Sequence, residues 1–344
     1  MIAVIIAGGS GTRLWPLSTP TYPKHLLKIN GDDLSLMQRT YERAKALADK
    51  VYVVSEASHI HHVKDQLPDL PDENFIVEPA RRGTASCIVA ALVRIGKTAP
   101  DDEPIAFLSA DHYIRDKRGF VHSLKIAAST AKSEGRIVLV GIEPDHPATG
   151  FGYIQKGKLL NDNNYVFNVH SFKEKPDFDT AQKYFESGDY LWNASYFVGC
   201  IRVFKTAMRA NAPELLANYE KLDAASDQEF EQVYLGFENI SIDYALIEKV
   251  TDLLVVPASF DWMDLGSFAD LAKAIGGDKA GNHRFGPNIE TEDAVSTFVH
   301  NYEDKPIAVI GLDHVVVINT PHGLLIVRKD MSQKVGDVSK RFKK

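Results

Sequence analysis

An unbroken apolar run, Ile2 to Ala7, opens the chain and leads directly into the glycine-rich segment Gly8 to Gly11. Such a run is typical of a strand that is buried on both faces of a parallel sheet. A glycine-rich turn after this strand lets backbone N–H groups approach an anion closely, and phosphate suits that position. Arg13 and Lys24 follow shortly and would add side-chain charge around the same hollow. The N-terminus therefore predicts an α/β fold with a phosphate site at the end of its first strand.

The glycine spacing matches neither of two common nucleotide-binding loops. A P-loop requires G-x-x-x-x-G-K-[ST], and the dinucleotide-binding fingerprint requires a third glycine where this chain has Leu14. For the glycines alone, an ordinary loop between a strand and a helix is an equal alternative. Arg13 and the pair Pro23-Lys24 favour the phosphate site.

Strand and helix patterns alternate through the first half of the chain. Helical crossovers between buried strands predict a Rossmann-like, mostly parallel sheet with helices on both faces. Ligands of such sheets bind beyond the carboxyl ends of the strands, where the Gly8 loop and Asp111 both lie. The predicted strands are residues 2–7, 51–55, 74–77, 104–109 and 136–141, and the predicted helices are 35–48, 58–66, 84–97 and 119–134.

After Thr149 the alternation gives way to patterns typical of a substrate-binding half. Hairpin-like pieces at 150–156 and 165–172 precede one helix at 180–187 and another at 203–219. The glycine-rich stretch from Gly276 to Asn282 reads as a linker or long turn. Short β-branched runs beyond it predict a small C-terminal β domain, with a brief β-helix-like stack as one form. We therefore expect domains at 1–275 and 282–344.

Composition excludes several classes of protein. The net charge of −7 argues against broad nucleic-acid binding, and the 344 residues contain no apolar run near the ~20 residues that a membrane helix requires. Met1 leads straight into a strand without a basic leader, so we expect a cytoplasmic protein. Cys87 and Cys200 lie far apart in apolar contexts and predict buried free thiols. His59, His61 and His62 are expected on a surface helix without further metal ligands.

A first metal candidate follows from the position of Asp111. Mg²⁺ prefers one or two protein carboxylates together with substrate phosphate oxygens, and a carboxylate just past a parallel strand can serve it. Asp261 and Asp264 lie far downstream, on either side of Trp262. A lone Asp is more often a cap or turn residue, so the assignment depends on the context of both acids.

The order of motifs along the chain resembles that of the sugar-1-phosphate nucleotidyltransferases, and within them the mannose-1-phosphate guanylyltransferases. The glycine loop with Pro23-Lys24 resembles the family signature, and Trp262 to Ser267 resembles its W-x-D-x-G-[ST] pattern. The resemblance extends from Ile2 to about Val335 and implies the nucleotidyltransferase fold. Further matching segments are Glu78 to Ala85, Thr149 to Ile154, Glu174 to Pro176, Trp192 to Phe197 and Ser241 to Lys249.

The resemblance implies roles in the nucleotide half. Arg13 and Lys24 would be the catalytic cations. Asp111 and Asp264 would hold Mg²⁺, and Asp261 is the less favoured candidate for the second ligand. Gly83 stands where the family usually has Asn, and Ser86 where it has Pro, which bears on base recognition. A purely helix-capping role would explain Thr84 but not the paired arginines. The implied nucleotide-binding positions are Ala7, Gly8, Gly9, Gly11, Glu78, Arg82, Thr84 and Ala85.

The resemblance also implies a site for the sugar phosphate. Glu174 would accept hydrogen bonds from sugar hydroxyls, Lys175 would lie near the phosphate, and Asn193 would bind the sugar; taken alone, Glu174 and Lys175 read equally as a solvated pair. The segment Ser241 to Lys249 reads mainly as an architectural helix. Ala194 and Ser195 depart from the family's W-N-S-G-x-F. The implied sugar-phosphate positions are Gly150, Tyr153, Glu174, Lys175 and Asn193.

The resemblance implies the reaction of GTP with α-D-mannose 1-phosphate to give GDP-mannose and diphosphate, with Mg²⁺ as cofactor. The implied partners are these two small molecules, with no nucleic acid and no membrane, and a homodimer is compatible with the sequence. One alternative is a sister enzyme for another hexose or heptose 1-phosphate or another nucleotide. Another is a catalytically silent, GDP-mannose-sensing regulatory subunit. The basic end, Lys340 to Lys344, reads as a solvated tail.

Overall fold

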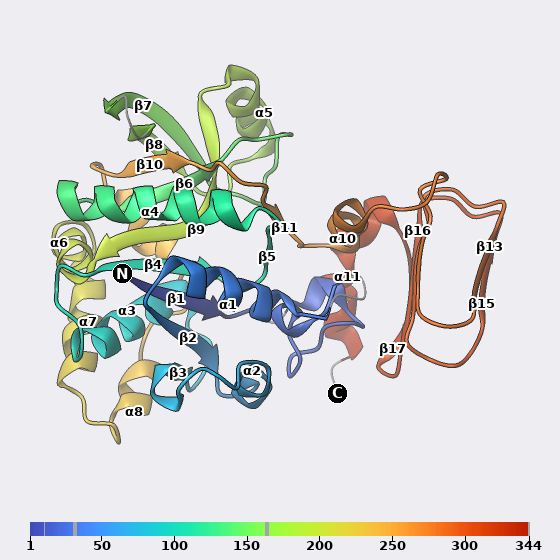
Figure 1. The fold of residues 1–344 in the computed structure, drawn as a ribbon, viewed down its shortest axis with the longest axis horizontal. Helices are drawn as coiled ribbons and strands as arrows, with labels where there is room; N and C mark the ends of the chain where they lie inside the picture. The colour runs from blue at the N-terminus through green and yellow to red at the C-terminus, as the bar shows by residue number, and fades with distance from the viewer. Residues whose placement is uncertain (10, 30–32, 162–164, 343–344) are drawn as a thin grey trace.

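A computed structural model of the chain describes residues 1–9, 11–29, 33–161 and 165–342. Within these residues a nine-stranded sheet forms the body of the molecule, and a small β domain stands at one end of it (Figure 1). The strand order is β3-β2-β1-β4-β9-β6-β10-β8-β7. The strands are β1 (Ile2–Ala7), β2 (Lys50–Glu56), β3 (Phe75–Glu78), β4 (Pro104–Ser109), β6 (Val138–Ile142), β7 (Tyr153–Asn161), β8 (Val166–Lys173), β9 (Tyr190–Cys200) and β10 (Leu254–Pro257).

The N-terminal half of the sheet has the predicted parallel arrangement. Strand β1 pairs in parallel with β2 and β4, and β2 pairs in parallel with β3. Two hydrophobic clusters cover the two faces of the sheet, which is why β1 is apolar almost throughout its length. The predicted α/β class with a small C-terminal β domain is confirmed.

The sequence patterns did not predict strands β9 and β10 of this sheet, and β9 has the greater effect on the site. It lies between β4 and β6 and runs antiparallel to both, whereas β6 and β10 are parallel to each other. Cys200 pairs with Pro104 and Phe197 with Phe107, so β9 starts at the edge where β4 ends. This reversal brings Asn193, near the start of β9, toward the sheet edge where the glycine loop leaves β1. Strands β7 and β8 also join the sheet by antiparallel pairing.

Helices pack on both faces of the sheet. Residues of α3, α6, α7 and α9 contribute to one hydrophobic cluster, and residues of α1, α2 and α4 to the other. Ser35 and Gln38 form a capping box at the start of α1, as their spacing allows. The helices are α1 (Leu36–Leu47), α2 (Ile60–Gln66), α3 (Gly83–Gly96), α4 (Lys117–Glu134), α5 (Phe178–Ser187), α6 (Ile201–Asn211), α7 (Pro213–Ala224), α8 (Phe230–Leu235), α9 (Ile242–Ala245), α10 (Phe268–Ile275) and α11 (Val335–Ser339).

Two local predictions were wrong. The single helix expected at 203–219 is two helices, because Pro213 has no N–H to continue the first one and instead begins α7. His59 does not lie on a surface helix. It precedes α2, is only 2% exposed, and its Nε2 lies 3.3 Å from the carbonyl oxygen of Ala7. Cys87 and Cys200 are buried free thiols, as predicted.

The C-terminal β domain follows the turn at 276–282, and its strands stack in parallel as in a short β-helix. Strands β12, β14 and β16 pair in parallel, β17 closes that sheet antiparallel, and β13 pairs with β15. No helix among the described residues is long and apolar enough to cross a membrane. The strands are β12 (His283–Phe285), β13 (Ile289–Glu292), β14 (Phe298–Asn301), β15 (Ile307–Ile310), β16 (Val315–Thr320) and β17 (Gly323–Arg328).

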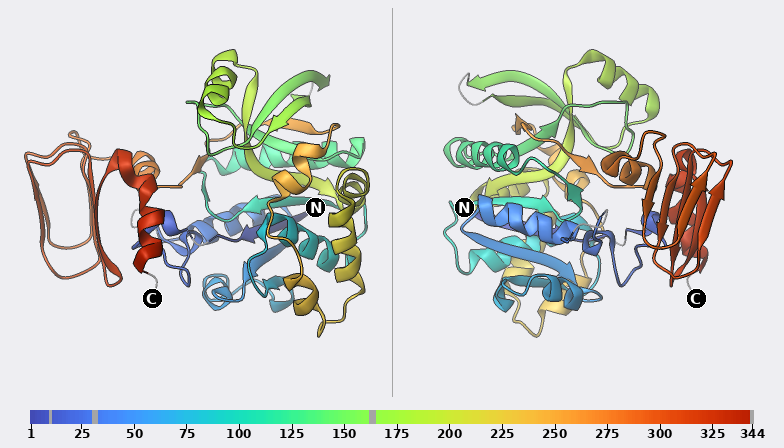
Figure 2. Two further views of the ribbon diagram at one scale, coloured as in Figure 1. Left: turned by 180° about the vertical axis from the view of Figure 1, so that it is seen from behind. Right: turned by 45° about the vertical axis from the view of Figure 1, so that its right-hand side comes forward.

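The C-terminal domain is joined to the glycine-loop region by a shared core. Leu14, Leu265, Phe268, Phe298 and Val335 belong to one buried hydrophobic cluster. Helix α11 therefore lies against the segment that follows β1, between the body of the molecule and the small β domain (Figure 2). The C-terminal segment therefore meets the segment after β1 beside the predicted phosphate site.

Candidate active site

The glycine loop lines a cavity of about 370 Å³ beyond the carboxyl end of β1. Gly9 and Gly11 have left-handed backbone angles, with φ of 96° and 56°. A Cβ atom added at Gly11 would lie 2.6 Å from Cβ of Lys24, so a glycine is required there for Lys24 to approach. Ser10 lies outside the described residues. The cavity is lined by Gly8, Gly9, Gly11, Thr12, Arg13, Leu14, Lys24, His25, Arg81, Asp111, Gly266 and Lys340.

Lys24 forms ion pairs with both predicted metal ligands. Its Nζ lies 3.0 Å from Oδ2 of Asp111 and 2.7 Å from Oδ1 of Asp264. The lysine side chain is 7% exposed, whereas those of Asp111 and Asp264 are 34% and 22% exposed. Burial lowers the pKa of Lys24, but the two carboxylates outweigh it and raise this pKa above its ordinary value. Burial alone would raise the pKa of Asp111, but the nearby Lys24 ammonium outweighs burial and lowers this pKa.

A small two-stranded sheet explains how Asp264 reaches Asp111. Strand β5 (His112–Tyr113) follows Asp111 directly and pairs antiparallel with β11 (Met263–Asp264), so that Asp264 lies opposite His112. Asp261 is engaged elsewhere. Its Oδ1 accepts hydrogen bonds from the backbone N–H groups of Arg115 and Asp116, and its Oδ2 from Nε of Arg115. Asp261 therefore stabilises the segment at the start of α4.

The convergence of Asp111 and Asp264 fits a divalent cation. Both carboxylates already point at one cationic atom, Nζ of Lys24, and Mg²⁺ in phosphoryl-transfer sites takes one or two carboxylates plus phosphate oxygens. Among the described residues no group of three or more His, Cys, Asp or Glu side chains could hold a metal ion. The protein thus offers a partial ligand set that phosphate oxygens of a substrate would complete.

A second, smaller cavity adjoins the first. It measures about 160 Å³ and shares Gly8, Gly9, Arg81 and Asp111 with the glycine-loop cavity. Glu78 is buried in its wall and accepts hydrogen bonds from the Tyr234 hydroxyl and from Sγ of Cys87, 2.9 Å away. Burial raises the pKa of Glu78. The remaining lining residues are Ile6, Glu56, Gly83, Thr84, Cys87 and Ser109.

Several predicted nucleotide-binding residues have other partners. The guanidinium of Arg82 donates to the carbonyl oxygen of Leu235 from Nε and Nη2, at 3.1 and 2.9 Å, and among the described residues Arg81 lines both cavities while Arg82 lines neither. Thr84 does not cap α3, because Gly83 begins this helix; its Oγ1 accepts instead from the N–H of Ile242. Ala7 and Ala85 are buried.

The predicted sugar residues meet around a buried acidic pair. Nδ2 of Asn193 donates to Oδ1 of Asp243 at 2.8 Å, and Glu174 is 6% exposed with Oε1 2.8 Å from Nζ of Lys175. The other oxygen of Glu174, Oε2, has no hydrogen-bond partner among the described residues. Burial, followed by the charge of Glu174, raises the pKa of Asp243 to about 7. Asp243 was not predicted as a site residue.

The strands β7, β8 and β9 position this cluster. Tyr153 at the start of β7 pairs with Lys173 at the end of β8 and with Trp192 in β9. Glu174 and Asn193 directly follow these two partners, so both lie beside the loop that precedes β7. A Cβ atom at Gly152 would lie 2.4 Å from Oε2 of Glu174, which explains this glycine. The Tyr153 side chain is fully buried. Gly150 is exposed in the preceding loop.

Aromatic rings connect the acidic pair to the glycine-loop side. The Trp262 ring lies 5.0 Å from His112, 5.2 Å from Phe151 and 6.5 Å from Trp192, measured between ring centroids. His112 follows Asp111, and Trp192 precedes Asn193. The phosphate-side and sugar-side residues are therefore linked by packed aromatic rings.

Family models match both parts of the chain. A model described as nucleotidyl transferase matches residues 2–280. The chain belongs to this family. A second model, described as a MannoseP isomerase/GMP-like beta-helix domain, matches residues 288–342.

Comparison with individual relatives identifies the branch of this family to which the chain belongs. Escherichia coli mannose-1-phosphate guanylyltransferase is 33% identical over 98% of this chain and 75% of its own length. Salmonella typhimurium mannose-1-phosphate guanylyltransferase RfbM is 33% identical over 97% of this chain and 71% of its own. A Thermus thermophilus crystal structure, named mannose-1-phosphate geranyltransferase, superimposes with a TM-score of 0.89 at 28% identity and covers 99% of this chain and 98% of that one. This nucleotidyl transferase is thus an enzyme of the mannose-1-phosphate guanylyltransferase family.

Two departures of this nucleotidyl transferase from its family pattern, Gly83 and Ser195, lie at positions with a left-handed backbone. Gly83 has a φ of 76°, and a Cβ atom there would lie 2.2 Å from the carbonyl oxygen of Ile240, so a larger residue requires the chain at Ile240 to move. Ser195 stands where the pattern has Gly and keeps a left-handed φ of 55°. Its N–H donates to Oδ1 of Asn193 at 3.0 Å, which holds the Asn193 amide in place.

Sequence reasoning missed Arg81, Asp243, Glu56 and Lys340. Arg81 is adjacent to the predicted Arg82, and Asp243 lies in the segment read as architectural, so the motifs contained both. Lys340 contradicts the reading of the C-terminal end as a solvated tail, because it lines the glycine-loop cavity. Nothing in the sequence linked it to Gly8.

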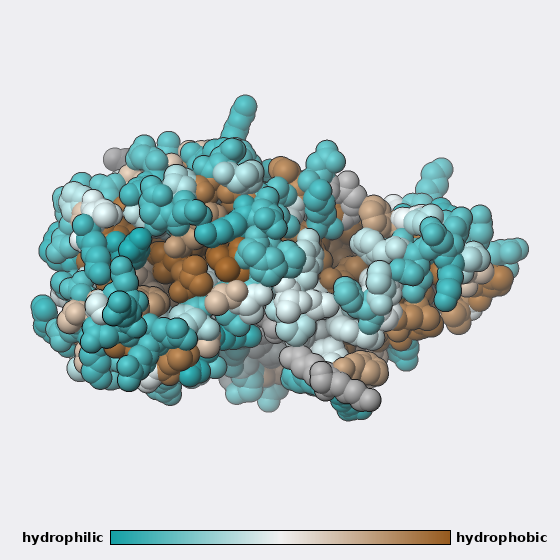
Figure 3. All heavy atoms as spheres, turned by 90° about the horizontal axis from the view of Figure 1, so that it is seen from below, coloured by the Kyte–Doolittle hydropathy of each residue, from teal (hydrophilic) through white to brown (hydrophobic). Residues whose placement is uncertain are grey.

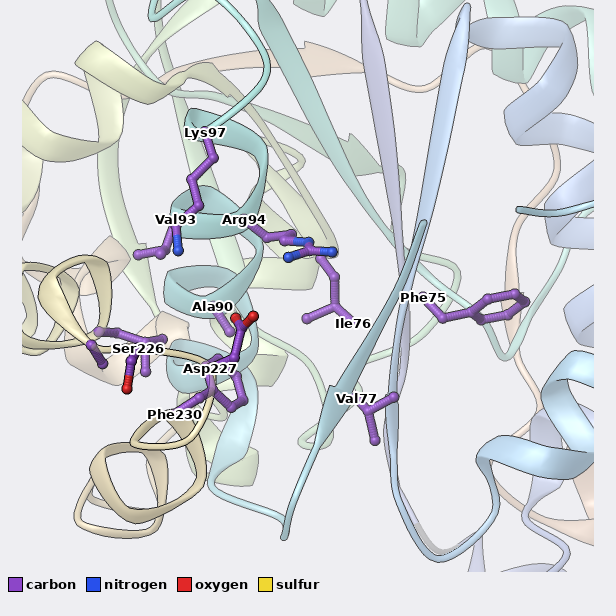
Figure 4. A pocket seen from close by; sticks show the side chains of 12 residues that line it. Phe75, Ile76, Val77, Ala90, Val93, Arg94, Lys97, Ser226, Asp227 and Phe230 are labelled. Atoms are coloured by element: carbon purple, nitrogen blue, oxygen red, sulfur yellow. The ribbon is translucent and has the colours of Figure 1, made fainter. Parts of the chain in front are cut away.

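Another cavity, of about 200 Å³, lies beside the edge strand β3 (Figure 4). Its walls come from β3, α3, α7 and the segment leading into α8, and they are mostly apolar, with Arg94, Lys97 and Asp227 among them. None of the predicted site residues lines it. The candidate active site is therefore the region around the glycine loop and not this cavity.

Proposed function

We propose that this enzyme transfers the guanylyl group of GTP to α-D-mannose 1-phosphate, giving GDP-mannose and diphosphate. One observation carries the proposal beyond family membership. A cation-lined glycine loop, two convergent carboxylates and a buried cluster of polar side chains, namely Glu174, Asn193 and Asp243, lie along one edge of the sheet. These are the parts that joining a nucleoside triphosphate to a sugar phosphate requires.

The reaction needs positioning and charge stabilisation more than proton transfer. An oxygen of the sugar phosphate attacks the α-phosphorus in line, a new P–O bond forms, and the bond to the β-phosphate oxygen breaks. The electron pair of that bond leaves with diphosphate. Because the attacking phosphate is already anionic near neutral pH, no strong general base is needed. Preorganised donors around the phosphates are expected to supply most of the rate enhancement.

Each cationic group has a proposed place in that step. Backbone N–H groups of the glycine loop and the Arg13 guanidinium hold the departing diphosphate. Lys24 neutralises charge on the α-phosphoryl group or the sugar phosphate, and its burial favours a fixed position. Asp111 and Asp264 hold Mg²⁺, which when bound neutralises charge on the phosphates. Asp261 has no part in this proposal.

The smaller cavity is the proposed site of the guanosine part. Guanine presents N–H donors at N1 and at its exocyclic amine, and carboxylates are suitable acceptors for both. Glu78 and Glu56 line this cavity, and Arg81 connects it to the phosphate side. We assign to Arg81 the nucleotide contact that the sequence motif indicated for Arg82. Backbone groups near Ala7, Thr84 and Ala85 would lie alongside the nucleotide.

The buried acidic pair is the proposed site of the mannosyl hydroxyls. Glu174 and Asp243 are acceptors, and Oε2 of Glu174 has its acceptor capacity unused in the part of the chain that is described. Asn193 is held against Asp243 and would orient it. Lys175 is half exposed and can reach the sugar phosphate from the rim. Backbone groups at Gly150 and Tyr153 would complete the contact.

The experiment is a matrix of nucleoside triphosphates against sugar 1-phosphates with the purified enzyme, followed by separation of the sugar nucleotide formed. We expect GTP with α-D-mannose 1-phosphate to give the highest kcat/KM. Higher kcat/KM for another hexose or heptose 1-phosphate, or for another nucleotide, would reassign the substrate. Absence of turnover with every pair, while GDP-mannose still binds, would favour a regulatory protein.

We also propose that the enzyme is a cytoplasmic homodimer, the location being inferred from its use of a nucleoside triphosphate. Leu324 and Ile326 share one face of β17, an edge strand, and are 56% and 63% exposed. Exposed apolar surface is visible on the C-terminal end of the molecule (Figure 3). Apolar surface of this kind favours association. Light scattering after size exclusion should give twice the chain mass, and Leu324→Glu with Ile326→Glu should give the monomer mass.

A further inference from the structure

Lys340 lines the same cavity as the glycine loop, although it lies 329 positions after Gly11. The cavity contains basic side chains from separate parts of the chain, namely Arg13, Lys24, Arg81 and Lys340. Lys24 is already paired with Asp111 and Asp264. Of the other three, Lys340 is paired with the exposed carboxylate of Asp337, and this exposed pair leaves it accessible to a highly charged phosphate group.

Packing on both sides of Lys340 fixes the position of its backbone. Val335 is 2% exposed and belongs to the same buried cluster as Leu14. Ser339 is buried, and the Phe342 ring stacks on Trp15 with 5.1 Å between ring centroids. Lys340 lies between these two anchors, so it is not part of a free tail.

The same C-terminal segment also holds Arg13. Oε1 of Gln333 accepts a hydrogen bond from Nη1 of Arg13 at 3.3 Å. A Cβ atom added at Gly336 would lie 3.0 Å from Cγ of Arg13, so the small residue lets α11 lie directly against the arginine stem. The C-terminal segment thus positions one cation of the cavity and supplies another.

Lys340 is available to a ligand. Its side chain is 63% exposed, and its Nζ lies 2.9 Å from Oδ1 of Asp337. An ion pair this exposed is typically worth less than ~1 kcal/mol, so an anion in the cavity can compete with Asp337 for the ammonium.

We propose that Lys340 binds the diphosphate group, as the β- and γ-phosphates of the bound triphosphate and as the released product, and that the C-terminal domain thereby completes the active site. This inference rests on the proposed function for the direction of the reaction. It extends that function by assigning a substrate contact to a residue outside the nucleotidyl transferase match at 2–280. The C-terminal domain then takes part in binding as well as in packing.

The test compares Lys340→Ala, Lys340→Arg and the neighbouring control Arg341→Ala, which removes the same charge at a position outside the cavity lining. Binding of inorganic diphosphate is measured by titration calorimetry, and the reverse reaction gives KM for diphosphate and for GDP-mannose. We expect Lys340→Ala to weaken diphosphate binding about tenfold and to raise KM for diphosphate similarly. Lys340→Arg and Arg341→Ala should stay within about twofold of the parent, and KM for GDP-mannose should not change. Melting temperatures identify any variant that fails to fold.

The outcomes separate this inference from the proposed function. If the parent enzyme turns over and Lys340→Ala binds diphosphate as the parent does, the role of Lys340 is wrong and the function stands. Equal losses in Lys340→Ala and Arg341→Ala would also overturn the role, because a general field effect would explain both. If the parent makes no GDP-mannose but Lys340→Ala alone loses diphosphate affinity, the site stands and the proposed reaction is wrong.

Discussion

The two ends of the candidate active site differ in charge and in how they are built. The glycine-loop end is open and rich in cations, and it is assembled from the N-terminus, the middle and the C-terminus of the chain. The sugar end is a buried acidic pair, with Glu174 just after β8 and Asp243 in α9, where Asn193 of β9 donates to Asp243. The first suits phosphate, which is recognised by charge and remains partly solvated. The second suits hydroxyl groups, which need fixed acceptors in a site shielded from water.

The strongest test of the phosphate end concerns the metal pair. If Asp111 and Asp264 share one Mg²⁺, we expect Asp111→Asn and Asp264→Asn each to lower Mg²⁺-dependent GDP-mannose synthesis by about 10³-fold, on the scale of several kcal/mol of lost charge stabilisation. The double variant should be little worse than the worse single variant, because the two groups act as a unit. Multiplicative losses would refute a shared ion. Asp261→Asn is the control and should lose less activity, because Asp261 bonds to Arg115 and Asp116.

A second prediction for the phosphate end concerns Lys24. Lys24→Ala should lower kcat by about 10²- to 10³-fold, the loss typical of one preorganised donor. Lys28→Ala is the matched control, because Lys28 is exposed four positions away. Lys24→Ala should also bind Mg²⁺ more tightly in the absence of nucleotide, since Asp111 and Asp264 lose the ammonium that now lies between them. Unchanged turnover in a folded Lys24→Ala protein would remove Lys24 from the mechanism.

The sugar end predicts an unusual dependence of stability on pH. Asp243 has a pKa of about 7 in the folded protein, raised by burial and then by Glu174, against about 3.9 for an unfolded Asp. Between these values the folded state holds a proton that the unfolded state has lost, so the free energy of unfolding falls as pH rises from about 4 to 7 and levels off above. The contribution of Asp243 is at most about 4 kcal/mol.

Asp243→Asn should remove this dependence. Denaturant titrations of parent and variant at several pH values measure it, and the difference in unfolding free energy between them should change across that window. Glu174 and Lys175 face the same site, so Glu174→Gln is measured alongside. A difference that does not depend on pH would show that Asp243 titrates at its ordinary pKa.

Glu174→Gln tests which ligand the sugar end recognises. The substitution keeps the size of the side chain and removes its charge, so bonds from sugar hydroxyls should weaken by about 1.5–3 kcal/mol. We expect α-D-mannose 1-phosphate to bind roughly 10- to 100-fold more weakly while GTP affinity is unchanged. Titration calorimetry of the parent and of Glu174→Gln with each substrate measures both affinities. A loss confined to GTP would exchange the assignments of the two ends.

The adjacent arginines give the smallest expected effects. Arg81→Ala should raise KM for GTP about tenfold, because Arg81 lines both cavities of the phosphate end. Arg82→Ala should leave KM for GTP unchanged and lower stability by about 1 kcal/mol, because it loses two hydrogen bonds to Leu235. Steady-state kinetics and thermal melting of both variants provide the comparison. The reverse pattern would return the nucleotide contact to Arg82.

The phosphate end was largely predictable because its signal is local. The apolar strand, the glycine turn and Lys24 lie within the first 24 residues, and each has a direct physical reading. The acid pair needed the family resemblance, since Asp111 and Asp264 meet only through the pairing of β5 with β11. Arg81 and Arg82 show the limit of motif reading. A motif identifies the segment, but only the folded structure shows that Arg81 lines the cavities and that Arg82 bonds to Leu235.

The sequence named Glu174, Lys175 and Asn193 for the sugar end, but neither Asp243 nor the geometry of the cluster. Periodicity of apolar residues does not reveal strand direction, so the antiparallel course of β9 was not foreseen, although it brings Asn193 to the site. Asp243 was assigned to an architectural helix because its neighbours Ile242 and Ala245 are core residues. Its role depends on a contact across 50 positions with Asn193.

The sequence by itself determined the α/β class, the glycine loop and the family, because these depend on local backbone preferences and on motifs whose residues lie close together. Tertiary structure decided where charge accumulates. The pairing of Lys24 with two distant acids, the elevated pKa of Asp243 and the placement of Lys340 beside Gly11 all arise from side chains brought together across long separations. Electrostatic energy depends on distance and burial in space, and neither quantity can be read from positions along the chain.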